Sequence, residues 1–154
     1  DLHRADGYFG FKNGDKVRTI AIEVELNRKT SAKYCGAAEG YSDDDRIERV
    51  LWLVPAKSLA RRIYSVMRKS QEVKREMHDF ILVEDFLNSG WDAPIWGGPD
   101  KGKTVQTLLD EFAGGRAVEK ADTLPYRLLL DSRRSPIKSK KIENPLSTQG
   151  IATD

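Results

Sequence analysis

Residues 17–26 read VRTIAIEVEL, an aliphatic run that contains two glutamates. The run predicts a β-strand, because Val, Ile and Thr are enriched in strands. Strand alternation places Glu23 and Glu25 on the same face, roughly 7 Å apart. Carboxylates are costly to bury unless they are paired or bind a cation. The two glutamates therefore need an explanation, and a metal site is the most specific one.

The dipeptide Asn-Gly at residues 13–14 predicts a two-residue hairpin turn before this strand. The register of this turn pairs Asp6 with Ala21, so that Asp6 lies diagonal to Glu23 on the same face, within roughly 8 Å. A three-residue loop would shift the register by one and separate these acids. Three neighbouring carboxylates repel one another unless a cation lies among them, and a divalent ion with oxygen ligands suits this arrangement. The alternative is a solvent-exposed sheet face with ordinary surface acids.

Further along the chain, helical and extended patterns alternate. The predicted elements are a helix from Thr30 or Ser31 to about Gly40, a strand at 47–54, a helix from Ala56 to about Arg75, and a short strand at 80–83. Added to the β-ribbon, they give the order ββαβαβ. This order predicts the α/β class, with a mixed central sheet flanked by helices and helical crossovers between parallel strands.

The length of 154 residues suits a single hydrophobic core. We expect one domain over residues 1–131 and a basic, polar tail over residues 132–154. Because the chain begins at Asp1 without an initiator Met, we also expect an upstream helix or DNA-binding module. The sequence has no long apolar run, no signal-peptide pattern and a single cysteine. We therefore expect no membrane span and a cytoplasmic location.

Basic residues are concentrated between Lys57 and Arg75, where Glu72 is the only acid. An exposed helix usually alternates charges, so this excess favours contact with phosphates over a merely solvated face. Other basic residues belong to the preceding helix and to a glycine-rich loop near residue 100. The candidate DNA-binding residues are Lys33, Arg61, Arg62, Arg68, Lys69, Lys101 and Lys103.

Several short motifs resemble the PD-(D/E)XK nuclease superfamily: Asp6-Gly7, the hairpin, Glu23-Val24-Glu25 and then Lys29. More narrowly, the strings ADGYF, IAIEVELNRKTSAKY and RVLWLVP are similar to the nuclease-like domain of replication-relaxation type proteins of plasmids and mobile elements. The resemblance covers about residues 2–67, under half of the chain. Two positions depart from the pattern. Ala5 replaces the Pro of the family name, and Glu25 replaces the usual catalytic Lys. Some restriction endonucleases of the superfamily carry Glu at this position and cut DNA, whereas other members have lost activity.

The resemblance implies a restriction-endonuclease-like fold and phosphodiester hydrolysis with Mg²⁺ or Mn²⁺. Asp6 and Glu23 would bind the metal together with the carbonyl of Val24, and Glu25 is a further candidate ligand. Glu25 or Lys29 would orient or deprotonate the attacking water. Lys29 would lie about 13 Å from Glu25 along an extended chain, so this role requires the chain to turn back.

Two functions follow from this resemblance. The first is a metal-dependent DNA endonuclease or nickase in the replication or mobilisation of a plasmid or mobile element. The alternative is a catalytically inactive nuclease-fold module that binds DNA or assembles with replication or relaxosome proteins. Homodimer formation stays open, because no pairing signal such as a coiled-coil heptad is visible.

Residues 97–104 match the phosphate-loop pattern G-x-x-x-x-G-K-T, and residues 128–131 resemble the aliphatic run plus Asp that helps to hold magnesium in such proteins. A P-loop nucleotide triphosphatase is therefore a distant alternative. The context argues against it, because the preceding WDAPIW carries Asp92 and Pro94 where a buried strand is needed, and about fifty residues remain after the loop. The competing interpretation is a glycine-rich loop before an amphipathic helix.

Overall fold

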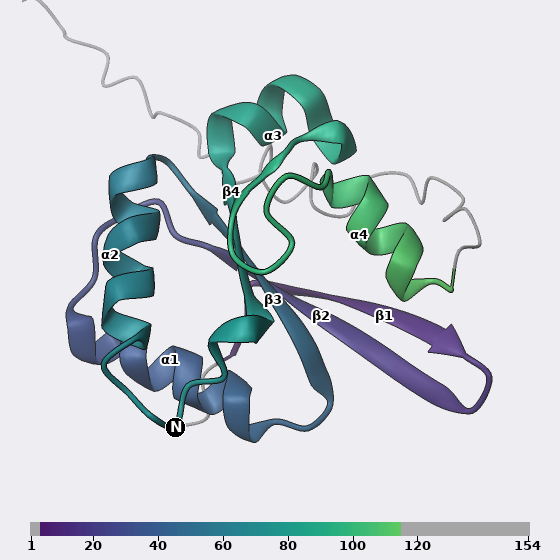
Figure 1. Ribbon diagram of the computed structural model, residues 1–154, viewed down its shortest axis with the longest axis horizontal. Helices are drawn as coiled ribbons and strands as arrows, with labels where there is room; N and C mark the ends of the chain where they lie inside the picture. Colours follow the sequence, from purple (N-terminus) through teal and green to yellow (C-terminus); the bar gives the residue numbers. More distant parts are fainter. Residues whose placement is uncertain (1–3, 115–154) are drawn as a thin grey trace, which may run out of the picture. The chain divides into compact units, whose positions relative to one another are not determined.

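The computed structural model describes residues 4–114, which form a five-stranded sheet with the strand order β1-β2-β3-β4-β5 and four α-helices (Figure 1). The predicted tail at 132–154 and the run at 128–131 lie outside the described residues. The strands are β1 (Gly7–Asn13), β2 (Lys16–Val24), β3 (Ile47–Val54), β4 (His78–Leu82) and β5 (Ile95–Gly97). The α-helices are α1 (Ser31–Asp43), α2 (Lys57–Met67), α3 (Val83–Ser89) and α4 (Val105–Phe112). Two short 3-10 helices are η1 (Arg75–Met77) and η2 (Gly90–Asp92).

Strands β2, β3 and β4 are parallel, whereas β1 and β5 are antiparallel edge strands. The crossovers from β2 to β3 and from β3 to β4 contain α1 and α2. A parallel pair needs such a crossover, because a tight turn joins only antiparallel strands. The prediction of an α/β domain with a mixed central sheet flanked by helices is therefore confirmed.

The predicted hairpin forms, but its register differs from the prediction by two residues. Gly14 has φ +61°, a conformation that glycine adopts without a Cβ clash, and the turn uses residues 14–15. Tyr8, not Asp6, pairs with Ala21. The predicted pairing of Asp6 is therefore wrong. Because the shift is even, side-chain parity is preserved, and continuing the register places Asp6 opposite Glu23.

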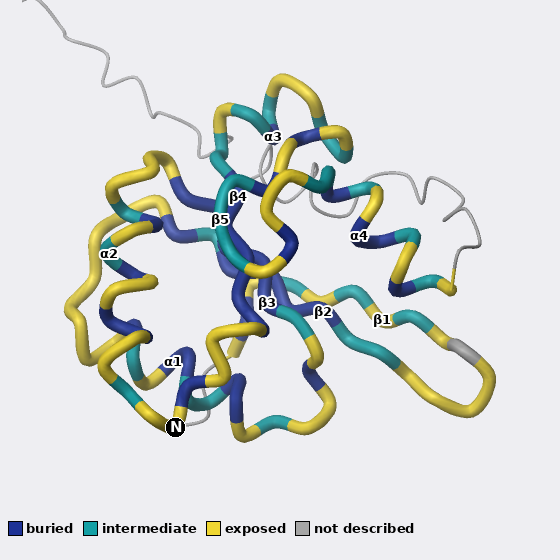
Figure 2. Tube along the Cα trace, in the orientation of Figure 1, coloured by how far each residue is buried: buried dark blue, intermediate teal, exposed yellow. Residues whose placement is uncertain are grey.

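Both faces of the sheet are covered, and β3, β4 and residues 20–23 of β2 are mostly buried (Figure 2). Helices α1 and α2 pack on one face around Trp52, which is 1% exposed. On the other face, the ring of Phe9 contacts Trp91 at 5.7 Å between centroids, and Phe11 contacts Phe112 at 6.1 Å. This double burial explains why residues 20–22 of β2, Ile-Ala-Ile, are apolar on both faces.

The alternative of an exposed sheet face with surface acids is wrong for Glu23 and Glu25, which are 3% and 2% exposed. Both follow Ala21 on the face that α1 and α2 cover. Their carboxylates therefore lie inside the protein, where each needs a hydrogen-bond donor or a cation.

Several boundaries differ from the predictions. Helix α2 ends at Met67 and not near Arg75. The hydrogen bonds change there from the α-helical i→i−4 pattern to i→i−3, because the amides of Lys69 and Ser70 donate to the carbonyls of Val66 and Met67. Val73 then enters the core. The basic residues after 67 consequently lie outside the helix. Helix α3 and strand β5 were not predicted; β5 has only three residues. Within residues 4–114, no helix is long and apolar enough to cross a membrane.

Candidate functional site

The four predicted catalytic residues come from three segments that meet at the end of β2. Asp6 immediately precedes β1, and Glu23 is the penultimate residue of β2. Glu25 directly follows β2, and Lys29 belongs to the connection to α1. The Nζ atom of Lys29 is 2.7 Å from Oε2 of Glu25. The pKa of Lys29 is raised by this contact, and further by the charges of Glu23 and Asp6. The structure therefore brings all four residues together.

The chain turns back after β2 because α1 holds the connection. The hydroxyl of Tyr34 accepts a hydrogen bond from the backbone N–H of Lys29 at 2.8 Å and donates to the carbonyl of Asn27 at 3.5 Å. Thr30, one of the two predicted starts of this helix, is the N-cap of α1, and its hydroxyl accepts from the amide of Lys33. The chain therefore turns back after β2, as a contact between Lys29 and Glu25 requires.

Glu23 is held by α1. The hydroxyl of Tyr41 donates a hydrogen bond to Oε1 of Glu23, and both side chains are buried. Burial, followed by this hydrogen bond, raises the pKa of Tyr41 well above its usual range. The Tyr41 hydroxyl therefore stays protonated and continues to act as a donor to the carboxylate.

Asp6 extends the hairpin by one position. Its backbone N–H donates to the carbonyl of Ile22 at 3.0 Å, and its Oδ2 accepts from the backbone N–H of Val24 at 2.7 Å. The carboxylate of Asp6 thus takes the place of the backbone carbonyl that a neighbouring strand would offer to the amide of Val24. Asp6 itself is exposed, in contrast to the two glutamates. It is the carboxylate of this group that solvent reaches most easily.

Glu23, Glu25, Lys29 and Lys33 line a cleft of about 470 Å³, together with Arg4, further α1 residues and Trp52. This carboxylate cleft has room for several water molecules, each of which occupies about 30 Å³ in the liquid. Within residues 4–114, no three His, Cys, Asp or Glu side chains are grouped closely enough to hold a metal ion by themselves. Mg²⁺, however, usually binds one or two carboxylates and retains waters. Asp6 and Glu23 fit this simpler oxygen donor set.

The predicted DNA-binding residues do not form one group. Lys33 lines the carboxylate cleft, whereas Arg61 and Lys101 line a second cleft. Arg68 and Lys69 are exposed just after α2. Arg62 and Lys103 are partly buried and therefore less accessible to DNA than the other predicted residues.

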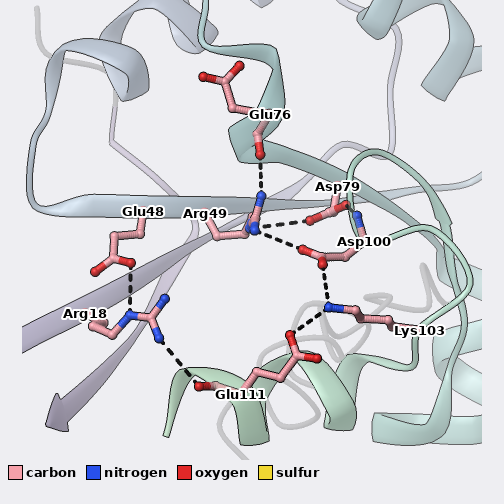
Figure 3. Close-up of polar contacts among 8 residues, drawn as sticks. All are labelled: Arg18, Glu48, Arg49, Glu76, Asp79, Asp100, Lys103 and Glu111. Carbon is pink, nitrogen blue, oxygen red and sulfur yellow. Dashed lines mark hydrogen bonds and ion pairs between the residues drawn. The ribbon is translucent and has the colours of Figure 1, made fainter. Parts of the chain in front are cut away.

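The glycine-rich loop at 97–104 is held by internal contacts (Figure 3). The Nζ atom of Lys103 is 2.9 Å from Asp100 and 2.7 Å from Glu111, and its pKa is raised by Glu111 and then by Asp100. The amide of Asp100 donates to Oδ1 of Asp79 at 3.0 Å, and that of Gly102 donates to the carbonyl of Ile95. A phosphate loop needs its lysine and amides for the phosphates. The geometry here favours the competing interpretation, a structural loop before α4.

A buried charge network was not predicted from the sequence. Arg49 of β3 lies 3.0 Å from Asp100 and 3.7 Å from Asp79, and it also donates to the carbonyl of Glu76 (Figure 3). Burial raises the pKa of Asp79 to about 7, and the charge of Asp100 contributes in the same direction. The available signal was the dipeptide at 78–79, a His and an Asp at the start of an apolar run. This network links the loop to the middle of the sheet.

No family model matches the chain, and no curated protein or solved structure is significantly similar to it. The resemblance to the PD-(D/E)XK superfamily therefore depends on the short motifs quoted above. The carboxylate cleft is the candidate functional site.

Proposed function

We propose that the protein is a metal-dependent DNA nuclease, an endonuclease or nickase, and that the carboxylate cleft is its active site. The observation that carries this proposal is the convergence of Asp6 with Glu23, Glu25 and Lys29 at the end of β2. The burial of two glutamates at a strand end is costly and calls for a role. A restriction-endonuclease-like arrangement, with the acids on a hairpin followed by a crossover helix, belongs to the same proposal.

Asp6 and Glu23 are the residues that would hold Mg²⁺ or Mn²⁺. When bound, the ion would polarise a phosphate and lower the pKa of a bound water. Glu23 is already oriented by Tyr41, and Asp6 by the amide of Val24, so both carboxylates have defined positions before a ligand arrives. Preorganised ligands reduce the cost of binding.

Lys29 and Glu25 would have different tasks. Since the pKa of Lys29 is raised, its ammonium group stays charged at neutral pH and is unsuited to accept a proton. It can instead stabilise negative charge on a phosphate. Glu25 is the carboxylate that can orient the attacking water, in the position where the resembling family usually has lysine. In this arrangement the lysine function has moved from position 25 to position 29.

Cleavage of supercoiled, linear and branched DNA during a titration with Mg²⁺ or Mn²⁺ tests the proposal. We expect Asp6→Asn and Glu23→Gln to lower the cleavage rate by about a hundredfold or more, with folding checked by circular dichroism. Glu84→Gln, which changes an exposed acid on α3, is the matched control and should cut normally. Continued cleavage by purified Asp6→Asn and Glu23→Gln would eliminate the proposal.

A second candidate is a catalytically inactive module that binds DNA or assembles with replication or relaxosome proteins. The observation that favours it is that all three carboxylates already have protein partners: Val24, Tyr41 and Lys29. This candidate predicts DNA binding that is independent of metal and strongly dependent on salt, without cleavage. The same titration separates the two, because strand cleavage at any metal concentration contradicts the inactive module. A role in plasmid or mobile-element replication is supported by the sequence resemblance alone.

A further inference from the structure

A second cleft, of about 440 Å³, is formed by α2, η1 and the loop after β5. None of its lining residues lines the carboxylate cleft. Its apolar part comes from Ala60, Phe80 and Trp96. Its volume lies within the range that is usual for small-ligand sites. The cleft is therefore a separate place on the domain where a ligand of modest size can bind.

The rim of this cleft is positively charged. It contains three exposed cations, Arg61, Arg75 and Lys101, against one acid, Glu76. Within residues 4–114, none of these three cations takes part in an ion pair. In contrast, Lys103 in the same loop is held by two carboxylates. The rim cations are therefore available to an anionic ligand.

The cleft also presents an aromatic surface. Trp96 is covered by cations, with Cζ of Arg61 at 5.4 Å and Nζ of Lys57 at 5.5 Å from its ring centroid. Tyr64 is 38% exposed, although its ring contacts Phe80 at 6.5 Å between centroids. An exposed aromatic ring beside unpaired cations is the combination that binds bases and phosphates of single strands.

We propose that this cleft binds one unpaired nucleotide of a DNA strand, with its base stacked on Tyr64 and its phosphates on Arg61, Arg75 and Lys101. A base inside a duplex cannot stack on a protein ring without leaving its own stack. The ligand is therefore a single-stranded or flipped nucleotide. The inference rests on the proposed function for its choice of DNA as the partner, and it adds the form of DNA that is bound.

The test measures the fluorescence anisotropy of a labelled short oligothymidylate with the full chain in EDTA, so that no cleavage interferes. We expect the wild type to bind this strand more tightly than a duplex of equal length. Tyr64→Leu should weaken binding about fivefold or more, whereas Tyr64→Phe retains the ring and should bind normally. The triple variant Arg61→Ala, Arg75→Ala and Lys101→Ala should also lower the slope of log K against log salt by about 0.7 per cation removed.

The matched control removes three exposed charges from outside both clefts: Lys12→Ala, Lys16→Ala and Arg28→Ala. Equal losses in the control and the cleft triple variant would overturn the inference, because binding would then follow total charge. Equal binding of strand and duplex, or normal binding by a folded Tyr64→Leu variant, would overturn it too. The mononucleotide dTMP should compete only weakly; competition as strong as that of the strand would identify a free-nucleotide site and contradict strand binding.

These results are independent of the nuclease test. Glu84→Gln, an exposed acid of α3 that lines neither cleft, should bind the oligothymidylate as the wild type does. If the wild type does not cleave DNA but binds the single strand more tightly than the duplex, only the nuclease proposal is removed. Cleavage by the wild type with binding unaffected by Tyr64→Leu and by the cleft triple variant would remove only the present inference.

Discussion

The ammonium group of Lys29 lies 2.7 Å from the carboxylate of Glu25, although β2 ends before both residues. The pair is asymmetric: the lysine side chain is 44% exposed, whereas that of the glutamate is 3% exposed. The lysine can exchange its partner for water, but the buried glutamate cannot do so as easily. Loss of the contact should therefore cost more for the buried Glu25 than for Lys29. The contact also keeps the ammonium group of Lys29 beside the acids of the cleft.

Lys29→Met should destabilise the fold, because it leaves the buried Glu25 without its cation. We expect a loss of about 1–2 kcal/mol in urea unfolding, less than the cost for fully buried pairs, since Lys29 is partly exposed. Lys33→Met, which changes an exposed lysine of the same cleft, should leave the free energy of unfolding nearly unchanged. Adding Glu25→Gln to Lys29→Met should recover part of the loss. Equal stability of the two lysine variants would refute the asymmetry.

Gly98→Ala should be strongly destabilising. Gly98 has φ +106°, and an added Cβ would overlap Oδ1 of Asp79 and the backbone carbonyl of His78. Gly102 has a similar φ of +93°, but a Cβ there would meet nothing within 4 Å. We expect losses of about 3 kcal/mol or more for Gly98→Ala and about 1 kcal/mol for Gly102→Ala, measured by thermal and urea unfolding. Similar losses in the two variants would mean that backbone strain, and not the overlap with β4, decides the cost.

Asp79 should make the protein less stable as the pH rises. The pKa of Asp79 is raised to about 7, so between about pH 4 and pH 7 the folded state binds more protons than the unfolded state. The free energy of unfolding therefore falls across this window. Asp79→Asn stays neutral and retains an oxygen that can accept from the amide of Asp100. The free energy of unfolding of Asp79→Asn minus that of the wild type should increase from pH 4 to pH 7, because this difference isolates Asp79 from other titrating groups. A difference that is constant with pH would show that Asp79 does not titrate there.

His78 should have the opposite effect. Burial lowers the pKa of His78 to about 4, and its Nδ1 accepts a hydrogen bond from Nε1–H of Trp52 at 3.0 Å. Between about pH 6.5 and pH 4 the unfolded state takes up the proton first, so stability falls as the pH falls. The contribution amounts to about 3 kcal/mol at the acid end. His78→Asn, with an oxygen in place of Nδ1, should remove this acid sensitivity in urea unfolding at pH 4 to 7. An unchanged acid dependence would refute the assignment.

Local patterns were sufficient for much of the fold. The strand at 47–54 has the predicted bounds, and Thr30, one of the two residues expected to start the helix, caps α1. Both follow from signals within a few residues: a continuous aliphatic run, and a hydroxyl side chain before a helical pattern. The α/β class followed from the order of these elements, because two parallel strands must be joined by a crossover.

Long-range contacts decided the rest. The hairpin register depends on which residues enter the turn, and Gly14 occupies a different turn position from the predicted one. The approach of Lys29 to Glu25 depends on Tyr34, which lies on the next helix. The network of Arg49, Asp79 and Asp100 joins residues that are distant in the chain.

The amino-acid sequence alone thus determined where most strands and helices form and that Glu23 and Glu25 share one face, because these properties depend on neighbouring residues and on strand parity. The tertiary structure alone decided which donor or cation each buried carboxylate meets. That choice depends on how the helices pack against the sheet, since partners of a buried charge come from whichever element covers it.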